Sequence, residues 1–151
     1  MVRVRHLKIQ NFRAINSMEW VPSPGINCLI GPGDSGISSV LETTDLCLGT
    51  RRSARFTDTD FHLLDVFHRI QITVTVGALP DELLNLDTYG EFLRGFDAST
   101  GRVEDEPQAD IETALSVQLQ VGQIWNQSGR SYLKGPWRKG SSADWRGSTS
   151  R

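Results

Sequence analysis

Two segments of the chain alternate strictly between apolar and polar residues, and both are predicted to form half-buried strands. They are residues 70–76 and residues 115–121. The apolar positions are Ile70, Ile72, Val74, Val76, Leu115, Val117, Leu119 and Val121. Because successive side chains of a strand point to opposite faces, a period of two places all the apolar side chains of a segment on one face. Extended runs at residues 2–9 and 17–21 predict two further strands near the N-terminus.

A different pattern follows the turn-forming sequence at residues 22–25. Residues 26–30 are a short, mostly apolar run, which is typical of a strand covered on both faces. A glycine-rich loop comes next, at residues 31–36, and apolar residues then recur at helical spacing. The helical positions are Val40, Leu41, Thr44, Cys47 and Leu48. The pattern therefore predicts a strand, a loop and an amphipathic helix in succession, with Gly49 ending the helix. A later short helix is expected to open at Pro80.

The character of the chain changes at residue 122. Residues 122–151 contain five glycines, six serines and three of the four tryptophans, without a helical or strand period. They carry six basic residues and one acid, a net charge of +5. Because the net charge of the whole chain is −2, residues 1–121 have a net charge of −7. We therefore divide the chain into a folded unit, residues 1–121, and a tail, residues 122–151, that is predicted to be disordered. Two origins of the tail stay open. One is a change of reading frame in the gene, and the other is a genuine tail whose basic and aromatic side chains contact single-stranded nucleic acid.

Length and composition restrict the class of protein. The chain has 151 residues, of which 38% are hydrophobic and 23% charged, as in soluble globular proteins of one domain. It has no apolar stretch near the ~20 residues of a membrane span and no secretion signal at its N-terminus. Cys28 and Cys47 lie among apolar residues and suggest buried free thiols in a reducing compartment. These features predict a cytoplasmic protein with no membrane partner.

The glycine-rich loop matches the phosphate-binding motif known as Walker A, in the strand–loop–helix context that this motif requires. Its residues are Gly31, Pro32, Gly33, Asp34, Ser35, Gly36, Ile37, Ser38 and Ser39. Glycines let successive backbone N–H groups surround phosphate oxygens, and the start of the helix adds more N–H groups and its positive dipole end. Ser38 holds the position whose hydroxyl reaches Mg²⁺. Ile37 stands where a lysine normally contacts the β- and γ-phosphates, so we expect weak nucleotide binding without efficient phosphoryl transfer.

Three further stretches lie around this loop, namely residues 7–15 (LKIQNFRAI), residues 25–31 (GINCLIG) and, after Gly36, residues 38–41 (SSVL). Through these stretches, the first 48 residues resemble the RecF/SMC-like branch of ABC-type ATPases. Within this branch the chain looks most like the OLD (overcoming lysogenization defect) family, described as ATP-dependent endonucleases. The likeness continues to about residue 121.

The resemblance implies an α/β fold, namely a P-loop ABC-type ATPase head with a mixed sheet, whose paired copies hold ATP and Mg²⁺ and thereby control DNA engagement. The implied nucleotide-binding residues are Gly31, Gly33, Asp34, Ser35, Gly36, Ile37, Ser38 and Ser39, with Ser38 also at the metal. Arg13 would lie near the phosphates, and an exposed arginine after a strand is the alternative. DNA would be a partner only of the full-length proteins of such a family, not of this chain by itself. The chain itself would form a homodimer or pair with an intact homologous head.

Several parts that such heads need are not found in the sequence. No Walker B segment is present, because residues 83–87 (LLNLD) lack the second carboxylate and lie in a helical context. The ABC signature loop and the carboxylate cluster of a TOPRIM nuclease domain are also missing. We therefore expect an incomplete head that binds ATP but neither hydrolyses it nor cuts DNA alone. A non-enzymatic module that regulates an intact head, and a gene remnant without function, are the alternatives. Asp58, Asp60 and His62 are of the types that bind metals, but on a polar loop they are expected to be solvated.

Overall fold

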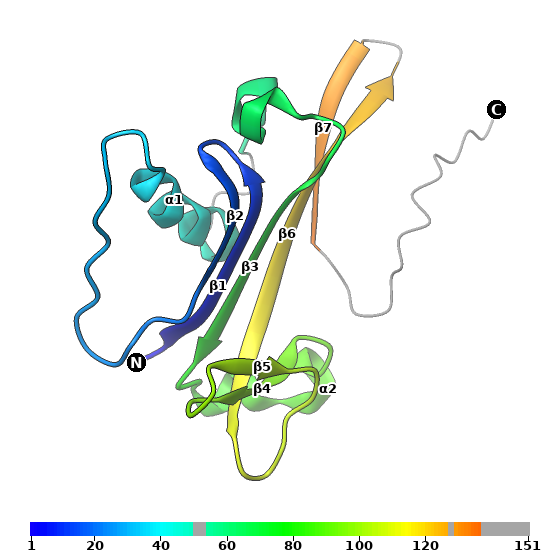
Figure 1. Cartoon of the computed structure of the whole chain (residues 1–151). Coiled ribbons are helices and arrows are strands. Elements are labelled where there is room, and N and C mark those ends of the chain that lie inside the picture. Colours follow the sequence, from blue (N-terminus) through cyan, green and yellow to red (C-terminus); the bar gives the residue numbers. More distant parts are fainter. Residues whose placement is uncertain (50–53, 127–128, 137–151) are drawn as a thin grey trace, which may run out of the picture.

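The computed structural model describes residues 1–49, 54–126 and 129–136, and for residues 125, 126 and 129–136 it describes the backbone alone. Seven strands form one sheet in the order β2-β1-β3-β6-β4-β5, with β7 paired to β6. Helix α1, Ile37–Leu48, packs against one face of this sheet, over β1, β3 and β6 (Figure 1). No helix in the described part of the chain is long and apolar enough to cross a membrane.

The two N-terminal strands form a tight antiparallel hairpin, and both were predicted. β1 spans Arg3–Phe12 and β2 spans Ile15–Trp20. Arg13 and Ala14 make the turn between them, and Arg13 has a φ of 49°. A positive φ in a two-residue turn matches the right-handed twist of the flanking strands. The hairpin therefore ends in a narrow tip, and this tip reaches the start of α1.

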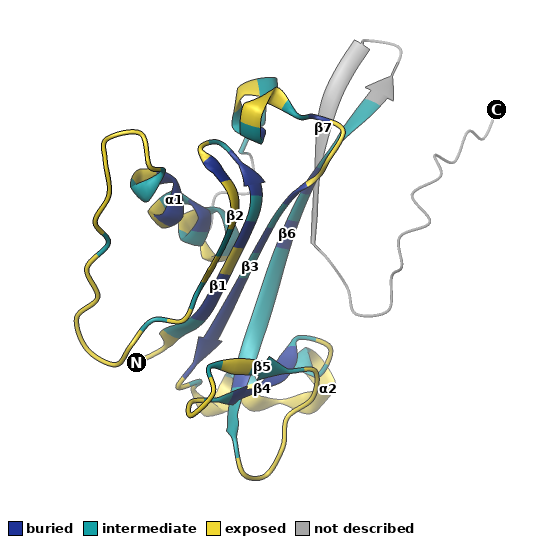
Figure 2. Ribbon diagram, viewed as in Figure 1, coloured by how far each residue is buried: buried dark blue, intermediate teal, exposed yellow. Residues whose placement is uncertain are grey.

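The two strictly alternating segments are the central strands of the sheet, as predicted. β3 spans Ile70–Gly77 and pairs with β6, which spans Glu112–Asn126. Their apolar side chains face α1 and join those of β1 in one core cluster. In Figure 2, β3 is dark blue over most of its length, whereas β6 is mostly teal. The opposite face is polar, and there the Gln118 amide donates a hydrogen bond of 3.0 Å to the Thr73 hydroxyl. One covered face and one polar face account for the period of two in the sequence.

The remaining elements are short. The 3-10 turns η1, Asp58–Asp60, and η2, His62–Leu64, lie between α1 and β3. The predicted helix after Pro80 is a single 3-10 turn, η3, Asp81–Leu84, followed by one turn of α-helix, α2, Leu86–Tyr89. A hairpin of β4, Leu93–Asp97, and β5, Arg102–Glu104, then leads into β6. Neither of these two strands shows a clear alternation of apolar and polar residues in the sequence.

The expectation of a mixed sheet is wrong for the described strands, because all their pairings are antiparallel. Residues 26–30, predicted to be a buried strand before the glycine-rich loop, form no regular element. Ile26 is fully exposed, Ile30 is 89% exposed and Cys28 is exposed rather than buried. The physical reason is that no described segment lies beside residues 26–30 to accept their backbone hydrogen bonds, and an isolated strand is unstable.

The expected disorder from residue 122 onward is also wrong for the backbone of residues 122–126 and 129–136. β6 continues without interruption to Asn126, and β7, Gly129–Pro136, folds back along it from Leu119 to Asn126. Backbone pairing with the end of β6 orders this segment although its side chains show no period. Residues 127–128 and 137–151 lie outside the described part of the chain.

Candidate nucleotide-binding site

The glycine-rich loop passes directly into α1. The amide of Ser35 donates a 3.0 Å hydrogen bond to the carbonyl of Pro32, which closes a turn at the tip of the loop. Gly36 is the N-cap residue of α1, and its carbonyl accepts the first helical hydrogen bond from Val40 at 3.0 Å. The strand expected before the loop is absent, but the loop and helix have the local order that the sequence predicted.

The position of Gly36 requires glycine for two reasons. Its φ of 85° lies in the left-handed region, which side chains disfavour. A Cβ there would also come within 3.0 Å of Ile15 and 3.4 Å of Ala14, at the start of β2. Gly36 thus brings the loop into contact with the tip of the β1–β2 hairpin. Gly33, by contrast, lies in open space.

The N-terminus of α1 has the features of an anion site. No side chain caps it, and its first turn contains no acidic residue. The backbone N–H groups of an uncapped first turn need other partners, and phosphate oxygens meet that need. Ser35 and Ser38 are not buried here, whereas Ser39 is buried with 7% of its surface accessible. Of the two serines at the motif's hydroxyl end, Ser38 is therefore the one available to a metal ion or phosphate.

The charge around the loop works against a phosphate group. Residues 31–49 contain three acids and no lysine or arginine. The acids are Asp34 in the loop and Glu42 and Asp45 on α1. Ile37, at the lysine position, is half-buried, and its Cδ1 lies 3.5 Å from where a Cβ on Gly31 would stand. Backbone N–H groups and the helix dipole are thus the attractive contributions that this segment offers.

Arg13, the cation that the motif assigns to the phosphates, lies in an ion-pair cluster. Its Nε donates to Asp60 at 3.0 Å, and its two terminal nitrogens donate to the carboxylate of Glu42, one of them at 3.0 Å. Partial burial lowers the pKa of Arg13, but hydrogen bonds and charges from Glu42 and Asp60 outweigh it and raise the pKa overall. The guanidinium carbon also lies 4.9 Å from the ring centre of Phe12. Arg13 therefore ties the hairpin tip to α1 and η1.

Two other candidate groups lie elsewhere or have other partners. Residues 83–87 belong to η3 and α2, at the end of the sheet occupied by β4 and β5 (Figure 1), and the Asn85 side chain accepts a hydrogen bond from the Asp87 amide. Asp60 is bound to Arg13, and His62 Nδ1 lies 2.8 Å from the carbonyl of Arg13. Among the described residues, no three His, Cys, Asp or Glu side chains come together as metal ligands.

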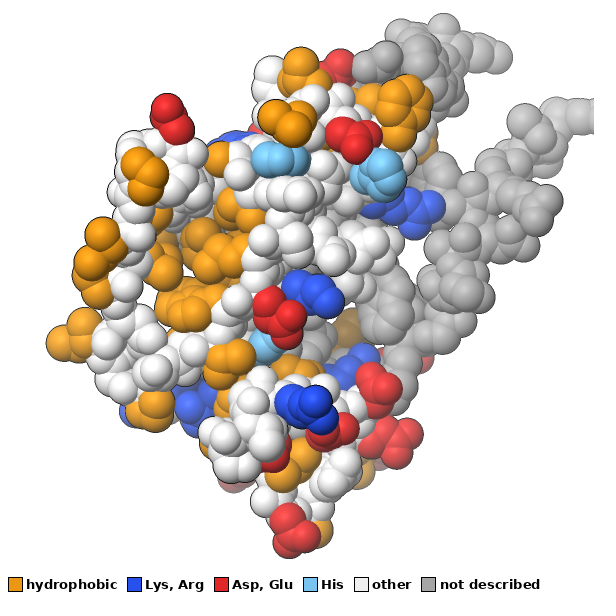
Figure 3. Space-filling model, in the orientation of Figure 1, with side chains coloured by type: hydrophobic (Ala, Val, Ile, Leu, Met, Phe, Trp, Pro, Cys, Tyr) orange, Lys and Arg blue, Asp and Glu red, His pale blue; other side chains and the backbone are white. Residues whose placement is uncertain are grey.

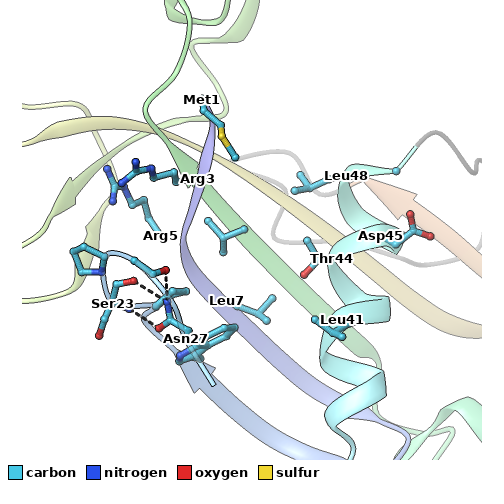
Figure 4. Close-up of a pocket in the computed structure, with 16 residues that line it drawn as sticks. Met1, Arg3, Arg5, Leu7, Ser23, Asn27, Leu41, Thr44, Asp45 and Leu48 are labelled. Carbon is cyan, nitrogen blue, oxygen red and sulfur yellow. Dashed lines mark hydrogen bonds between the residues drawn. The ribbon is translucent and has the colours of Figure 1, made fainter. Parts of the chain in front are cut away.

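A pocket of about 910 Å³ lies between β1, the segment that precedes the glycine-rich loop and helix α1, and no residue of the loop itself lines it. Figure 4 shows Leu7 of β1 and Leu41 of α1 pointing into it from opposite sides, with Asn27 at its edge. Apolar side chains gather around this hollow on the surface seen in Figure 3. Leu41 is 66% exposed although it belongs to the apolar stripe of the helix. The apolar face of α1 is thus only partly covered by described residues.

Comparisons with known proteins show that part of the chain is similar to RecF proteins. The protein named DNA replication and repair protein RecF from Prosthecochloris aestuarii is 40% identical over 57 residues, which are 38% of this chain and 15% of the relative. RecF of Nitrosococcus oceani is 46% identical over 55 residues, and RecF of Chlorobium luteolum is 38% identical over 50. The similarity spans only about 15% of the length of these relatives. No family model matches the chain.

Sequence reasoning missed three residues that organise the surroundings of the loop. Glu42 and Asp60 bind Arg13, and Asn11 is buried and donates hydrogen bonds to the carbonyls of Asp65, at 3.0 Å, and His68, at 2.7 Å. Asn11 lies in the string NFRAI, which the sequence analysis had singled out for its family resemblance. The string does not reveal the hydrogen-bond partners of Asn11, because they lie more than fifty residues away in the sequence. Glu42 carried no signal of its own, and Asp60 stood out only as a metal-type residue that was expected to be solvated, whereas it forms an ion pair with Arg13.

Proposed function

We propose that residues 31–39 bind the phosphates of ATP together with Mg²⁺, weakly and without hydrolysing the nucleotide. The observation that supports this most is the uncapped N-terminus of α1 directly after a glycine-rich loop, with Gly36 at positive φ. Such a helix start offers unpaired N–H groups and a positive dipole end to an anion. The partial similarity to RecF proteins supports the same assignment.

Weak binding follows from the charges. A Walker A lysine contributes a cation to the β- and γ-phosphates, and Ile37 contributes none. Arg13 already serves two carboxylates, and Asp34 lies in the loop itself. ATP bound here would depend on backbone groups, on Mg²⁺ and on the accessible hydroxyl of Ser38. The lack of a cation at position 37 supports binding without turnover, because that cation contributes to the transfer of the γ-phosphoryl group.

At a finer level, we propose that the chain corresponds to the ATP-binding N-terminal part of an OLD-type ATP-dependent endonuclease. The residues that support it are the strings LKIQNFRAI and GINCLIG together with the likeness that continues to about residue 121. In this proposal, the complete family protein binds DNA and pairs its heads. The proposal also places the protein in the cytoplasm.

The second candidate is a regulatory module that binds an intact homologous head without using ATP. The observation that favours it is the charge of α1 and its loop, three acids and no base, which opposes phosphate binding. A pull-down of the intact head that is unaffected by ATP would favour this candidate over the first.

The test of the proposed function is titration of a fluorescent ATP analogue, with Mg²⁺, into the wild-type chain and into Ile37→Lys. We expect weak binding by the wild type and binding about tenfold tighter by the variant, since one charge-assisted contact contributes about 1.5 kcal/mol or more. Ile37→Met is the matched control, because it changes shape without adding charge, and it should bind like the wild type.

The same titration separates the two interpretations of Arg13. In the Ile37→Lys background, Arg13→Gln should leave affinity unchanged if Arg13 only ties the hairpin tip to α1, and should weaken it if Arg13 contacts phosphate. Failure of both the wild type and Ile37→Lys to bind, with both chains folded by circular dichroism, would refute the proposed function.

A further inference from the structure

A second pocket, of about 250 Å³, lies on the polar face of the sheet, opposite α1. Strands β1 and β5 both line it, although three other strands separate them in the sheet. The sheet must therefore curl, and Figure 1 shows β4 and β5 turned across the end of β6. The walls are mainly strands that pair with one another, so the pocket follows from the fold of the described residues.

Arg94 of β4 brings a buried positive charge to this pocket, because only 8% of its surface is exposed. Its Nη1 donates hydrogen bonds to the carbonyls of Leu93, at 2.7 Å, and Glu91, at 2.9 Å. Among the described residues, no carboxylate forms an ion pair with Arg94, and its Nε and Nη2 have no hydrogen-bond partner. A buried charge without a partner is unfavourable, so an acceptor for these two donors would stabilise the site.

The two free nitrogens of Arg94 define the kind of acceptor. The N–H groups of Nε and Nη2 point in parallel from one edge of the planar guanidinium, which matches the two oxygens of a carboxylate. The hydroxyls of Thr75 and Ser116 lie 2.7 Å apart in the same pocket, and this pair can donate one more hydrogen bond. His6 lies opposite Thr75, but its Nε2 is 2.7 Å from the carboxylate of Glu19. Arg94 is therefore the principal anchor for an anion.

The exposed residues of the lining have the opposite charge. Glu91 and Asp105 line the pocket and are exposed, whereas Arg94 is buried. Two carboxylates at the opening repel an anion of high charge, such as phosphate, and attract a positive group. Phe92 and Val103 are half-buried in the lining and offer apolar surface. A ligand that fits this lining has one carboxylate, one positive group and a small apolar part.

We propose that this pocket is a binding site for a small amino acid. The carboxylate of the ligand lies on the Nε–Nη2 edge of Arg94, its ammonium group faces Glu91, and its side chain contacts Phe92. The volume of about 250 Å³ is below the usual range for drug-sized ligands and suits a smaller molecule. No residue of the glycine-rich loop lines this pocket, and the inference does not depend on nucleotide binding.

The test is titration of L-valine into the ¹⁵N-labelled whole chain, followed by NMR. The Nε–H signal of Arg94, assigned by its loss in Arg94→Lys, should shift saturably because this group donates to the ligand. Two compounds of matched shape separate the charges, since isovalerate lacks the ammonium group of valine and isobutylamine lacks its carboxylate. We expect isovalerate to bind about two- to fivefold more weakly than valine, because an exposed ion pair contributes little, and isobutylamine to leave the signal unchanged.

Substitutions test each end of the pocket through the backbone amide signals of its lining residues. Arg94→Lys keeps the charge but loses the paired N–H edge, so valine should bind about tenfold more weakly or worse. Arg102→Lys makes the same change on an exposed side chain outside the pocket and should bind valine like the wild type. Glu91→Gln leaves the buried end intact and should abolish the preference for valine over isovalerate.

Circular dichroism establishes that each variant is folded, and Glu91→Gln carries the test if Arg94→Lys is not. The proposal would be overturned by a folded wild type that gives no saturable shift at millimolar valine, or by equal binding of valine and isovalerate. Undiminished affinity in Arg94→Lys, an unchanged valine preference in Glu91→Gln, or tighter binding of inorganic phosphate than of valine would overturn it as well. None of these outcomes bears on ATP binding by residues 31–39, which the fluorescent analogue tests separately.

Discussion

Gly36 and Gly33 stand three residues apart in the same loop, and the structure gives them different roles. Gly36 combines a φ of 85° with a close approach to Ile15, so it joins loop, helix and hairpin tip. A Cβ on Gly33 would have no neighbour within 4 Å, and the φ of Gly33 is not positive. The Walker A pattern fixes a glycine at position 36 and leaves position 33 variable, and in the structure Gly36, unlike Gly33, is required by the fold of the loop.

This difference predicts the stability of two alanine variants. Gly36→Ala should lower the free energy of unfolding by roughly 1–2 kcal/mol from the left-handed backbone alone, with a further loss from contact with Ile15. Gly33→Ala is the matched control and should stay within about 0.5 kcal/mol of the wild type. Urea denaturation followed by circular dichroism measures both. Equal effects of the two substitutions would contradict the left-handed conformation of Gly36.

At the scale of elements, the carboxylate of Asp97 stabilises the turn that connects β4 and β5. Asp97 accepts hydrogen bonds from the amide and hydroxyl of Ser99, at 2.8 Å and 2.7 Å, and from the hydroxyl of Thr100, at 2.8 Å. The Ser99 hydroxyl contributes most, followed by the Ser99 amide and Thr100, and together they lower the pKa of Asp97 from 3.8 to about 2. These bonds favour the ionised form because a carboxylate accepts more strongly than a carboxylic acid.

The pH dependence of this turn follows from the sign of that shift. Because the pKa is lower in the folded chain, the turn is fully stabilised above pH 3.8 and loses this stabilisation as the pH falls towards about 2. A carboxyl titration by NMR should find a midpoint near 2 for Asp97. Ser99→Ala should move the midpoint up towards 3.8, and Ser17→Ala, on β2, should not move it. A wild-type midpoint at the ordinary value would show that the turn is not formed.

At the scale of the whole molecule, one core joins the sheet, α1 and the segment before β3. Phe61 and Phe12 are buried to 1% and 0% exposure and form an isolated β-bridge, which holds residues 54–69 against the sheet. Because this cluster is continuous, loss of one large member should affect global unfolding rather than a local loop.

Two phenylalanines six residues apart test this continuity. Phe61→Ala should cost about 3–5 kcal/mol, the usual effect of removing a buried aromatic side chain, which is enough to unfold much of a marginally stable domain. Phe67 is 89% exposed, so Phe67→Ala should change the unfolding free energy by less than about 0.5 kcal/mol. Thermal melts of the two variants give the comparison. A Phe61→Ala protein that melts like the wild type would mean that this segment is not part of the core.

Much of the architecture could be read from local patterns. The period of two located β3 and the first part of β6, and the helical spacing that ends at Gly49 located α1. These signals are local because the side chains that produce them lie within one element and face one core. The β4–β5 hairpin was missed because its strands are short and carry no clear alternation.

What the sequence determined by itself is therefore the set of elements with regular periods and the chemistry of the phosphate-type loop, including its missing lysine. Only the tertiary structure decided which segments find hydrogen-bonding partners. Pairing with β6 gives residues 129–136 a regular backbone despite their composition, whereas residues 26–30 have strand character but pair with no described strand. The tertiary structure alone also brought Glu42 and Asp60 to Arg13. The physical reason is the same in each case: backbone groups and charges are satisfied by partners distant in sequence, which no local pattern specifies.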